Sequence, residues 1–343
     1  MRNDKQQIII WLMCGCLLVF AMVIIGGITR LTGSGLSITE WKVITGTFPP
    51  ISESEWNNEF AKYQISPQFQ KINSSFDVND FKKIYWWEYL HRLVGRMIGI
   101  VFIIPFLFFY FKKQIDKKLL PKLLFIFMLG AWQGFLGWYM VSSGLVDNPF
   151  VSHYRLAIHL VNAFITFGYI FWVALDLQFE KISKSSASKN MLMISILTFL
   201  LLLIQITYGA FVAGLHAGHI FNTWPKMGDE WIASAVRSSF QNEGFESLFS
   251  NMSVVQFIHR TIALIIFCLV SWMWFSRKRN ELNLSSQQQF AINISFVILN
   301  LQITLGIFTL LFSVPVWLGV THQAVAFLIF AALIFQMHRL AKG

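Results

Sequence analysis

Charged residues are scarce in this chain of 343 residues, because Lys, Arg, Asp and Glu together make up only 13% of it, against about 25% in ordinary soluble domains. Hydrophobic residues supply 55%. This balance excludes a soluble enzyme and a disordered protein. The formal net charge of +10 does not indicate a nucleic-acid partner, since in so apolar a chain the distribution of charge matters more than its sum.

Cysteine is equally scarce. The three cysteines, Cys14, Cys16 and Cys268, all lie within apolar stretches rather than between them. Neither a disulfide framework nor a CxxC metal site is available from this set. We interpret them as small packing residues.

Long hydrophobic runs are abundant instead. A helix of about 20 apolar residues is needed to cross a hydrocarbon core about 30 Å thick, and eight stretches meet that length. Because the first is longer than a signal-peptide core and no small-residue cleavage site follows it, we expect a retained helix. The predicted spans are 7–29, 88–111, 121–141, 154–177, 190–213, 253–275, 289–311 and 317–338.

The distribution of charge between alternate sides predicts the orientation. One side, which includes both termini, holds 15 Lys and Arg, whereas the opposite loops hold 8 against 12 Asp and Glu. By the positive-inside rule both termini are cytoplasmic. The two long outer segments, 30–87 and 214–252, have room for short structure of their own.

The second half of the chain resembles the first. His91 and His159 of the first half align with His259 and His322 of the second, and Gln133-x3-Gly137 aligns with Gln302-x3-Gly306. We therefore predict an all-α integral membrane protein whose eight transmembrane helices form two parallel-repeat four-helix bundles. The first comprises residues 1–189, including the outer loop 30–87, and the second residues 190–343.

Each of these four histidines lies near the outer end of its span. Ionisable residues inside a span indicate function, and two imidazoles facing each other in a helical bundle are typical ligands of a haem iron. A zinc site would instead require three or four clustered ligands. The pairs His91 with His159 and His259 with His322 therefore predict two haem sites near the outer face.

The two predicted sites differ in one chemically important residue. Glu88 precedes His91 by three residues, whereas Gln256 holds the equivalent place before His259. A carboxylate beside one haem and an amide beside the other indicate that only the first site performs proton chemistry. The cations at helix ends that could pair with haem propionates, or with lipid headgroups, are Arg30, Arg92, Arg155 and Arg260.

Several segments, in order along nearly the whole chain, resemble the haem A synthase family. The similarity is greatest to the alpha-proteobacterial and mitochondrial subgroup, which has a long first outer loop and lacks an outer cysteine pair. We attach no role to His216 or His219. The segments are GGITRLTGSGLSITEWKVITGTFPP (26–50), DFKKIYWWEYLHRLVGR (80–96), VSHYRLAIHL (151–160), GAFVAGLHAGHIFNTWPKM (209–227), QFIHR (256–260) and THQAVAF (321–327).

The resemblance implies an enzyme that oxidises the C8 methyl group of haem O to a formyl group, making haem A for cytochrome c oxidase. It implies that His91 and His159 ligate the substrate iron, that His259 and His322 ligate a resident haem b, and that Glu88 serves the chemistry. The main alternative is a dihaem b-type electron-transfer subunit that leaves haem unmodified. A haem or small-molecule transporter is disfavoured by the parallel repeat.

The implied setting is the inner cell membrane, with lipid around the chain and haem O as its substrate. The resemblance does not name the electron-transfer partner. Contact with a haem O synthase and self-association into a homo-oligomer are both compatible with it.

Overall fold

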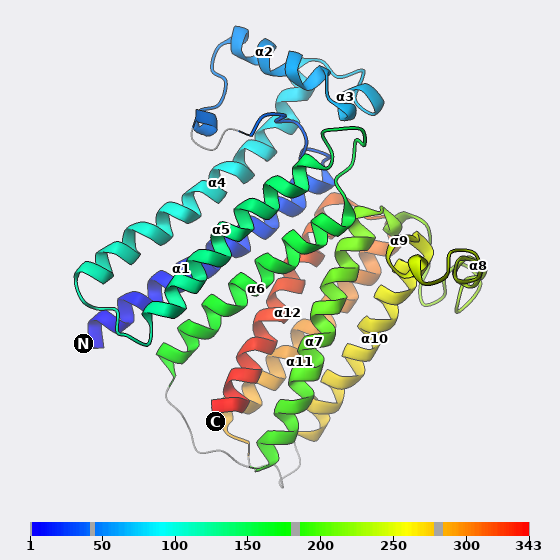
Figure 1. The fold of residues 1–343 in the computed structure, drawn as a ribbon. Helices are drawn as coiled ribbons and strands as arrows, with labels where there is room; N and C mark the ends of the chain where they lie inside the picture. The colour runs from blue at the N-terminus through cyan, green and yellow to red at the C-terminus, as the bar shows by residue number, and fades with distance from the viewer. Residues whose placement is uncertain (1, 42–44, 180–185, 278–283, 343) are drawn as a thin grey trace. The chain divides into compact units, whose positions relative to one another are not determined.

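The computed structural model describes residues 2–41, 45–179, 186–277 and 284–342, which lie almost entirely in α-helices and contain no β-strand. Eight of these helices are long and apolar enough to cross a membrane (Figure 1). The predicted all-α integral membrane protein with eight transmembrane helices is therefore confirmed. The eight are α1 (Arg2–Leu31), α4 (Val78–Phe111), α5 (Leu120–Ser142), α6 (His153–Gln178), α7 (Ser186–Gly214), α10 (Met252–Ser276), α11 (Ser286–Leu311) and α12 (Val316–Lys342).

One predicted span starts at a different residue in the structure. Helix α4 begins at Val78 rather than at residue 88, because Asp77 caps it: the Asp77 carboxylate accepts hydrogen bonds from the backbone N–H groups of Asn79 (2.8 Å) and Asp80 (2.9 Å). Lys278 and Arg279, two of the cations on which the predicted orientation depends, lie outside the described residues.

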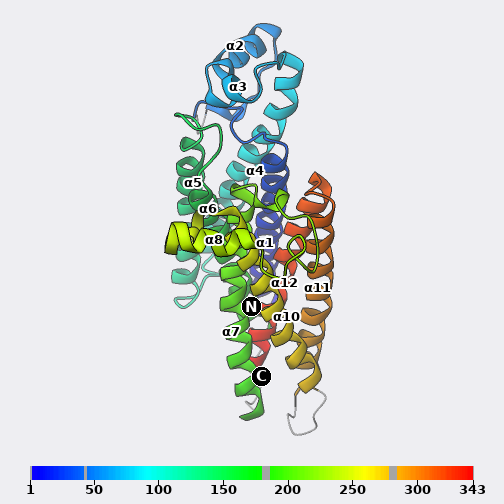
Figure 2. The ribbon, with the colours of Figure 1, turned by 90° about the vertical axis from the view of Figure 1, so that its right-hand side faces the viewer.

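The first outer segment folds into a small helical cap. Helices α2 (Glu53–Gln64) and α3 (Pro67–Lys71) lie at the N-terminal end of α4 (Figures 1 and 2). Ser52 and Glu55 form a reciprocal capping box that starts α2. The core of the cap is aromatic, with Tyr63 stacked on Phe81 at a centroid distance of 5.2 Å. The cap is thus built on the same helix that carries Glu88 and His91.

The chain divides into two compact units, each described separately. One unit comprises residues 17–163 and the other residues 1–16 with 164–343. In the second unit α7 packs against α10 and α12, and α11 packs against the same two helices. These four helices pack together within a unit that also contains most of α6 and the start of α1. The boundary predicted at residues 189 and 190 stays a prediction.

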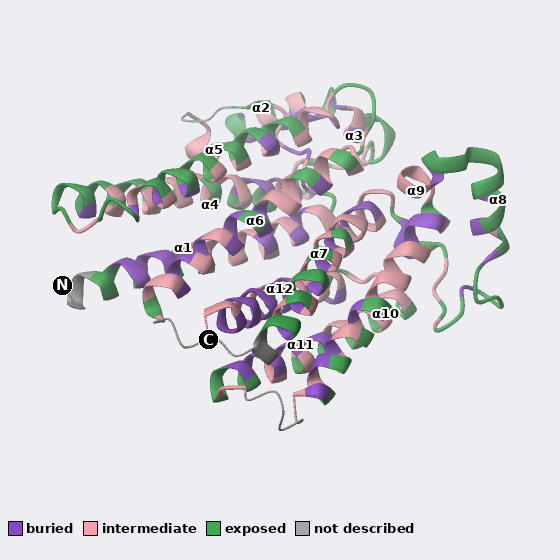
Figure 3. Ribbon diagram, turned by 60° about the horizontal axis from the view of Figure 1, so that its bottom comes forward, coloured by how far each residue is buried: buried purple, intermediate pink, exposed green. Residues whose placement is uncertain are grey.

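The second unit is tied together by a buried core that is both aromatic and polar. Phe327 of α12 packs against Phe164 and Phe167 of α6, at centroid distances of 4.9 and 4.3 Å. The buried Gln336 amide of α12 donates a 2.8 Å hydrogen bond to Ser195 of α7. Buried residues run along α12 in Figure 3. Of the residues in its most apolar stretch, 44% are buried, against 6% for α4. In lipid the hydrophobic effect does not drive helices together. Interhelical hydrogen bonds of this kind therefore contribute to the association of the helices.

Outer structure also lies at the start of α10. Helices α8 (Ser234–Glu243) and α9 (Ser247–Ser250) contact α10, and Val254 is completely buried in a cluster with Met227 and Val236. Both long outer segments thus carry the short structure that was predicted for them.

Candidate functional site

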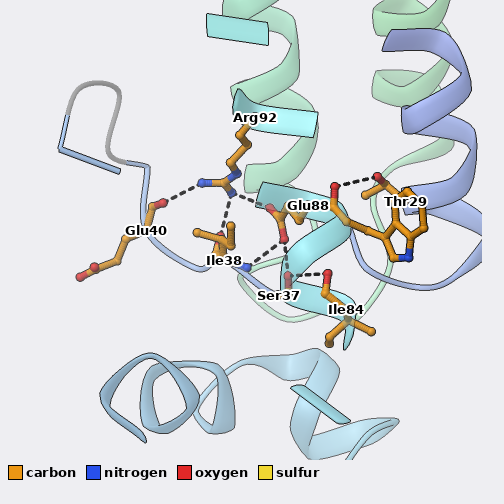
Figure 4. A network of polar contacts seen from close by, with 8 residues as sticks. Thr29, Ser37, Ile38, Glu40, Ile84, Glu88 and Arg92 are labelled. Carbon is orange, nitrogen blue, oxygen red and sulfur yellow. Dashed lines mark hydrogen bonds and ion pairs between the residues drawn. The ribbon is translucent and has the colours of Figure 1, made fainter. Parts of the chain in front are cut away.

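Glu88 is buried, with only 3% of its surface exposed, and both of its carboxylate oxygens are occupied (Figure 4). Arg92, one turn further along α4, donates to Oε1 at 2.6 Å. The Ser37 hydroxyl and the Ile38 backbone N–H each donate to Oε2 at 2.8 Å. Buried polar and charged side chains are stable only when they are paired in this way.

Arg92 also fastens the loop that follows α1. Its guanidinium donates to the backbone carbonyls of Ile38 (2.8 Å) and Glu40 (2.9 Å) and lies 5.1 Å from the centre of the Trp41 ring. Glu88, Arg92 and residues 37–41 therefore form one connected unit, which we call the acidic clasp.

The C-terminal half contains an equivalent arrangement with the opposite polarity. Gln256 lies where Glu88 does, and its amide donates to the carbonyls of Ala217 (2.9 Å) and Phe221 (3.3 Å). Arg260, four residues later, donates to the carbonyls of Phe221 (2.8 Å) and Thr223 (3.0 Å). We call this arrangement the amide clasp. Its loop presents carbonyl acceptors, whereas the loop of the acidic clasp also presents donors.

In residues 17–163, each predicted histidine ligand stands against a glycine of a neighbouring helix. A Cβ added at Gly26 of α1 would lie 3.2 Å from His91 Nε2, and one added at Gly137 of α5 would lie 3.2 Å from His159 Cε1. Both imidazoles of the first predicted pair thus lie in the same compact unit, each against the backbone of a neighbouring helix.

The second pair repeats this arrangement. An added Cβ at Gly209 of α7 would lie 3.2 Å from His259 Cε1, and one at Gly306 of α11 would lie 2.8 Å from His322 Cε1. His322 also acts electrostatically on His259. Any larger residue at these glycines would push the ring aside, so all four imidazoles depend on a close helix backbone.

The ring nitrogens of the second pair are incompletely satisfied. Nδ1 of His259 and Nδ1 of His322 are buried and have no hydrogen-bond partner. Buried polar atoms are rarely left unpaired without a functional reason. Paired neutral imidazoles on facing helices, with glycines beside them, fit a haem iron held from both sides. No cluster of three or more His, Cys, Asp or Glu able to hold a metal ion occurs in the described part of the chain.

The remaining predicted cations lie at helix ends. Arg30 is in the last turn of α1. Arg155 lies over the Tyr139 ring at 3.9 Å and donates to the Tyr139 carbonyl at 2.8 Å and the Ser142 hydroxyl at 3.2 Å. Nε of Arg260 is buried without a partner. That nitrogen is the clearest unused donor among the four arginines predicted to meet propionates.

The other histidines lie away from the paired ones along the chain. His216 has a left-handed backbone (φ 56°) just before the 3-10 turn Ala217–His219, which ends at His219. His153 starts α6, with its ring 4.0 Å from that of Tyr154. His338, completely buried on α12, lies 3.2 Å from Asp176 of α6.

Sequence reasoning missed three features of the site. Gln205 contacts His259 across 3.3 Å, and its spacing to Gly209 equals that of Gln133 to Gly137, so the motif was detectable. Ser37 was not singled out because a loop serine carries no positional signal. The importance of Gly26 depends on a close approach between helices, which a sequence alone does not reveal.

Similarity to known proteins extends over nearly the whole chain. The sequence profile of the cytochrome oxidase assembly protein family matches residues 9–334. The heme A synthase of Flavobacterium psychrophilum is 47% identical over 100% of both chains, and that of Flavobacterium johnsoniae 46% identical over 100% of both. The heme A synthase of Nitrosospira multiformis is 46% identical over 98% of this chain and 94% of its own. The chain belongs to the cytochrome oxidase assembly protein family.

Proposed function

We propose that this protein is an oxidoreductase that converts the C8 methyl group of haem O into a formyl group, making haem A for cytochrome c oxidase. Full-length similarity to heme A synthases supports the reaction. The observation in the structure that carries the proposal is the acidic clasp, which places a buried carboxylate three residues from one member of the first histidine pair. The second pair has an amide in that position.

His91 and His159 would hold the iron of the substrate haem O, and His259 and His322 would hold a resident haem b as a bis-histidine complex. The glycine contacts and the unpaired Nδ1 atoms of the second pair support this assignment. A resident haem b supplies one-electron relay chemistry, with a potential set by its ligands and burial. Near the propionates we place Arg30, Arg92, Arg155 and Arg260.

Oxidising a methyl group to an aldehyde removes four electrons. Two successive two-electron oxygenations, each placing one oxygen atom on the carbon, give first an alcohol and then a gem-diol, which loses water to leave the formyl group. With water as the oxygen source, each step releases two protons and passes two electrons to the electron-transfer partner, and Glu88 is the carboxylate available to accept or orient the protons. Ser37 donates to Glu88 Oε2 at 2.8 Å and holds that oxygen in place.

The distribution of charge supports a topology in which both termini lie on the cytoplasmic side of the inner membrane. In that topology the four histidines lie near the outer ends of their helices, and both haem sites lie towards the outer face. The N-terminal half, residues 1–189, binds substrate, and the C-terminal half, residues 190–343, binds the resident haem. A haem O synthase is the natural supplier of the substrate.

Mass spectrometry of the haems bound to protein coexpressed with a haem O synthase tests the reaction directly. The wild type should contain haem A or its hydroxylated precursor. Glu88→Gln should lower haem A formation by about 10²- to 10⁴-fold, the usual contribution of a general acid or base, while haem O stays bound. Glu53→Gln, the same change at an exposed position of α2, is the matched control and should leave the product unchanged.

Two outcomes would contradict the proposal. Unchanged turnover in Glu88→Gln would remove the role of Glu88. Haem O that is bound and never modified by the wild type would favour the alternative, a dihaem b-type electron-transfer subunit.

A further inference from the structure

A glutamine side chain contacts each histidine of the C-terminal pair. Gln205 and Gln302 precede Gly209 and Gly306 by four residues, so each lies one helical turn from the glycine that supports the ring. Nε2 of Gln205 lies 3.3 Å from His259 Nε2, and Nε2 of Gln302 lies 3.4 Å from His322 Nε2.

These contacts select one tautomer. An amide nitrogen only donates, so each Nε2 must accept, and the ring proton must then be on Nδ1. This is the tautomer that leaves Nε2 available to iron.

Each glutamine and the histidine it contacts also contain one hydrogen-bond donor and one acceptor without a partner. The Nδ1 atoms of both histidines are buried without a partner, and so are the Oε1 atoms of Gln205 and Gln302. A buried polar atom without a partner costs about 1–3 kcal/mol. Iron at Nε2 would displace the amide N–H, and the amide oxygen could then accept the Nδ1–H.

In the N-terminal half, a glutamine amide lies within contact distance of both ring nitrogens of a histidine. Nε2 of Gln133 lies 3.3 Å from Nδ1 and 3.4 Å from Nε2 of His159. A glutamine in this position therefore lies within reach of both ring nitrogens.

Among the described residues of the N-terminal half, neither histidine has a free glutamine oxygen beside it. Met22 holds the place of Gln205, four residues before Gly26, and a thioether is only a weak acceptor. Gln133 is present, but its Oε1 accepts a 2.6 Å hydrogen bond from Asn162, and its Nε2 donates to the His159 carbonyl at 3.1 Å. Val325 stands where Asn162 would be in the C-terminal half, three residues after the histidine.

We propose that Gln205 and Gln302 are positioning residues for the axial histidines of the resident haem, and that Met22 and Asn162 withhold the same support from the substrate haem. The inference rests on the proposed function, since it takes haem as the ligand of both pairs. An acceptor at Nδ1–H makes an imidazole a stronger donor to iron and fixes the ring. The C-terminal pair thereby retains its haem, while the N-terminal pair can release its product.

The resident site can be tested without any haem O chemistry. The full chain is expressed with haem b in cells that make no haem O, and transfer of the bound haem to apomyoglobin is timed. Gln205→Leu and Gln302→Leu should each lose haem about 10- to 100-fold faster. If the substitution weakens the binding of ferric haem tenfold relative to ferrous haem, the midpoint potential of the haem rises by about 59 mV. Gln205→Glu, which restores an acceptor, should recover slow loss, and Gln289→Leu on exposed α11 is the control.

The converse experiment introduces the support into the substrate site. The double variant Met22→Gln with Asn162→Val reproduces the C-terminal environment, and haem released from the N-terminal site should then leave at least tenfold more slowly. Both the loss rate and the potential report ligand strength, which a purely structural role of the glutamines would leave unchanged in correctly folded protein.

Three results distinguish the role of the glutamines, the role of Met22 and Asn162, and the proposed function. Haem loss and potential that are unchanged in Gln205→Leu and Gln302→Leu would overturn this inference while leaving the proposed function intact. Unaltered release from the double variant would overturn the part that concerns Met22 and Asn162. A wild type that binds no haem b at all would overturn both the inference and the proposed function.

Discussion

The two clasps use the same backbone plan with opposite hydrogen-bonding polarity. Arg92 and Arg260 each lie four residues after the key side chain and each tie a loop to a helix by its backbone carbonyls. In the acidic clasp the loop donates to a carboxylate, whereas in the amide clasp the loop accepts from an amide. The comparison shows that equivalent positions of the two halves hold a buried carboxylate, Glu88, and a buried amide, Gln256, and that each loop supplies the hydrogen-bonding groups its side chain needs.

The largest effect should come from removing histidines. His259→Ala or His322→Ala should abolish the b-type absorption spectrum of the purified, reduced protein, because one imidazole cannot hold the resident haem from both sides. His91→Ala and His159→Ala should keep that spectrum and lose only bound haem O. Complete loss of the resident spectrum in His91→Ala would contradict the division of roles between the halves.

The next largest effect concerns the arginines of the clasps. Arg92→Leu leaves the buried Glu88 carboxylate without its cation, which costs about 3–5 kcal/mol. Arg260→Leu leaves a neutral amide and should cost about 1.5–3 kcal/mol, the loss of hydrogen bonds to a charged group. Thermal unfolding in detergent measures both.

A second substitution tests the cause of this difference. Adding Glu88→Gln to Arg92→Leu removes the unpaired charge and should restore part of the stability. Equal destabilisation by the two arginine substitutions would show that the polarity of the clasp does not matter.

Glycine contacts give a smaller effect. Gly306→Ala places a Cβ 2.8 Å from His322 Cε1, so the ring must move, at a cost of about 1–3 kcal/mol for overpacking. Gly26→Ala, with a 3.2 Å approach to His91, should cost less. Gly134→Ala is the control, since no atom lies within 4 Å of the added Cβ. Haem b occupancy that falls equally in Gly306→Ala and Gly134→Ala would argue against a ring-positioning role.

The smallest effect concerns an ion pair of the cap. Lys62 donates to Glu40 (2.9 Å) and Glu59 (2.7 Å), and these carboxylates raise the pKa of Lys62 above its ordinary value. The stabilisation is therefore fully present below the pKa of the unfolded lysine and is lost as the pH rises through the raised folded pKa. Lys62→Met should cost about 0.2–1 kcal/mol at neutral pH, because the pair is partly exposed.

The corresponding pair of the C-terminal half offers the contrast. Arg237 lies 3.2 Å from Glu230, and a guanidinium stays charged throughout the accessible pH range. Unfolding curves measured up to strongly alkaline pH should therefore show the loss for Lys62 and none for Arg237.

The eight membrane-spanning helices could be predicted from the sequence because a span of about 20 apolar residues is a long and unambiguous signal. The start of α4 could not, since the turns before residue 88 are held by the Asp77 cap and by packing against α2, neither of which is a hydropathy signal. The prediction therefore placed the helix start at the edge of the apolar run.

The candidate site divides in the same way. The four histidines and Glu88 stand out in the sequence because ionisable residues inside apolar spans are rare. Their supports do not stand out: Gly26 and Gly209 become meaningful only when two helices approach closely, and Ser37 only when a loop folds back on α4. The ionisable residues inside the spans were predictable from the sequence. The residues that contact and support them were identified only from the structure.

Helix α4 spans 34 residues without interruption, which corresponds to about 51 Å at 1.5 Å per residue and exceeds a hydrocarbon core of about 30 Å. Its first turns carry the aromatic cap, and Glu88 and His91 follow on the same helix. No loop separates the cap from the buried carboxylate, so a substitution that shifts the core of the cap also shifts the helix backbone that holds Glu88.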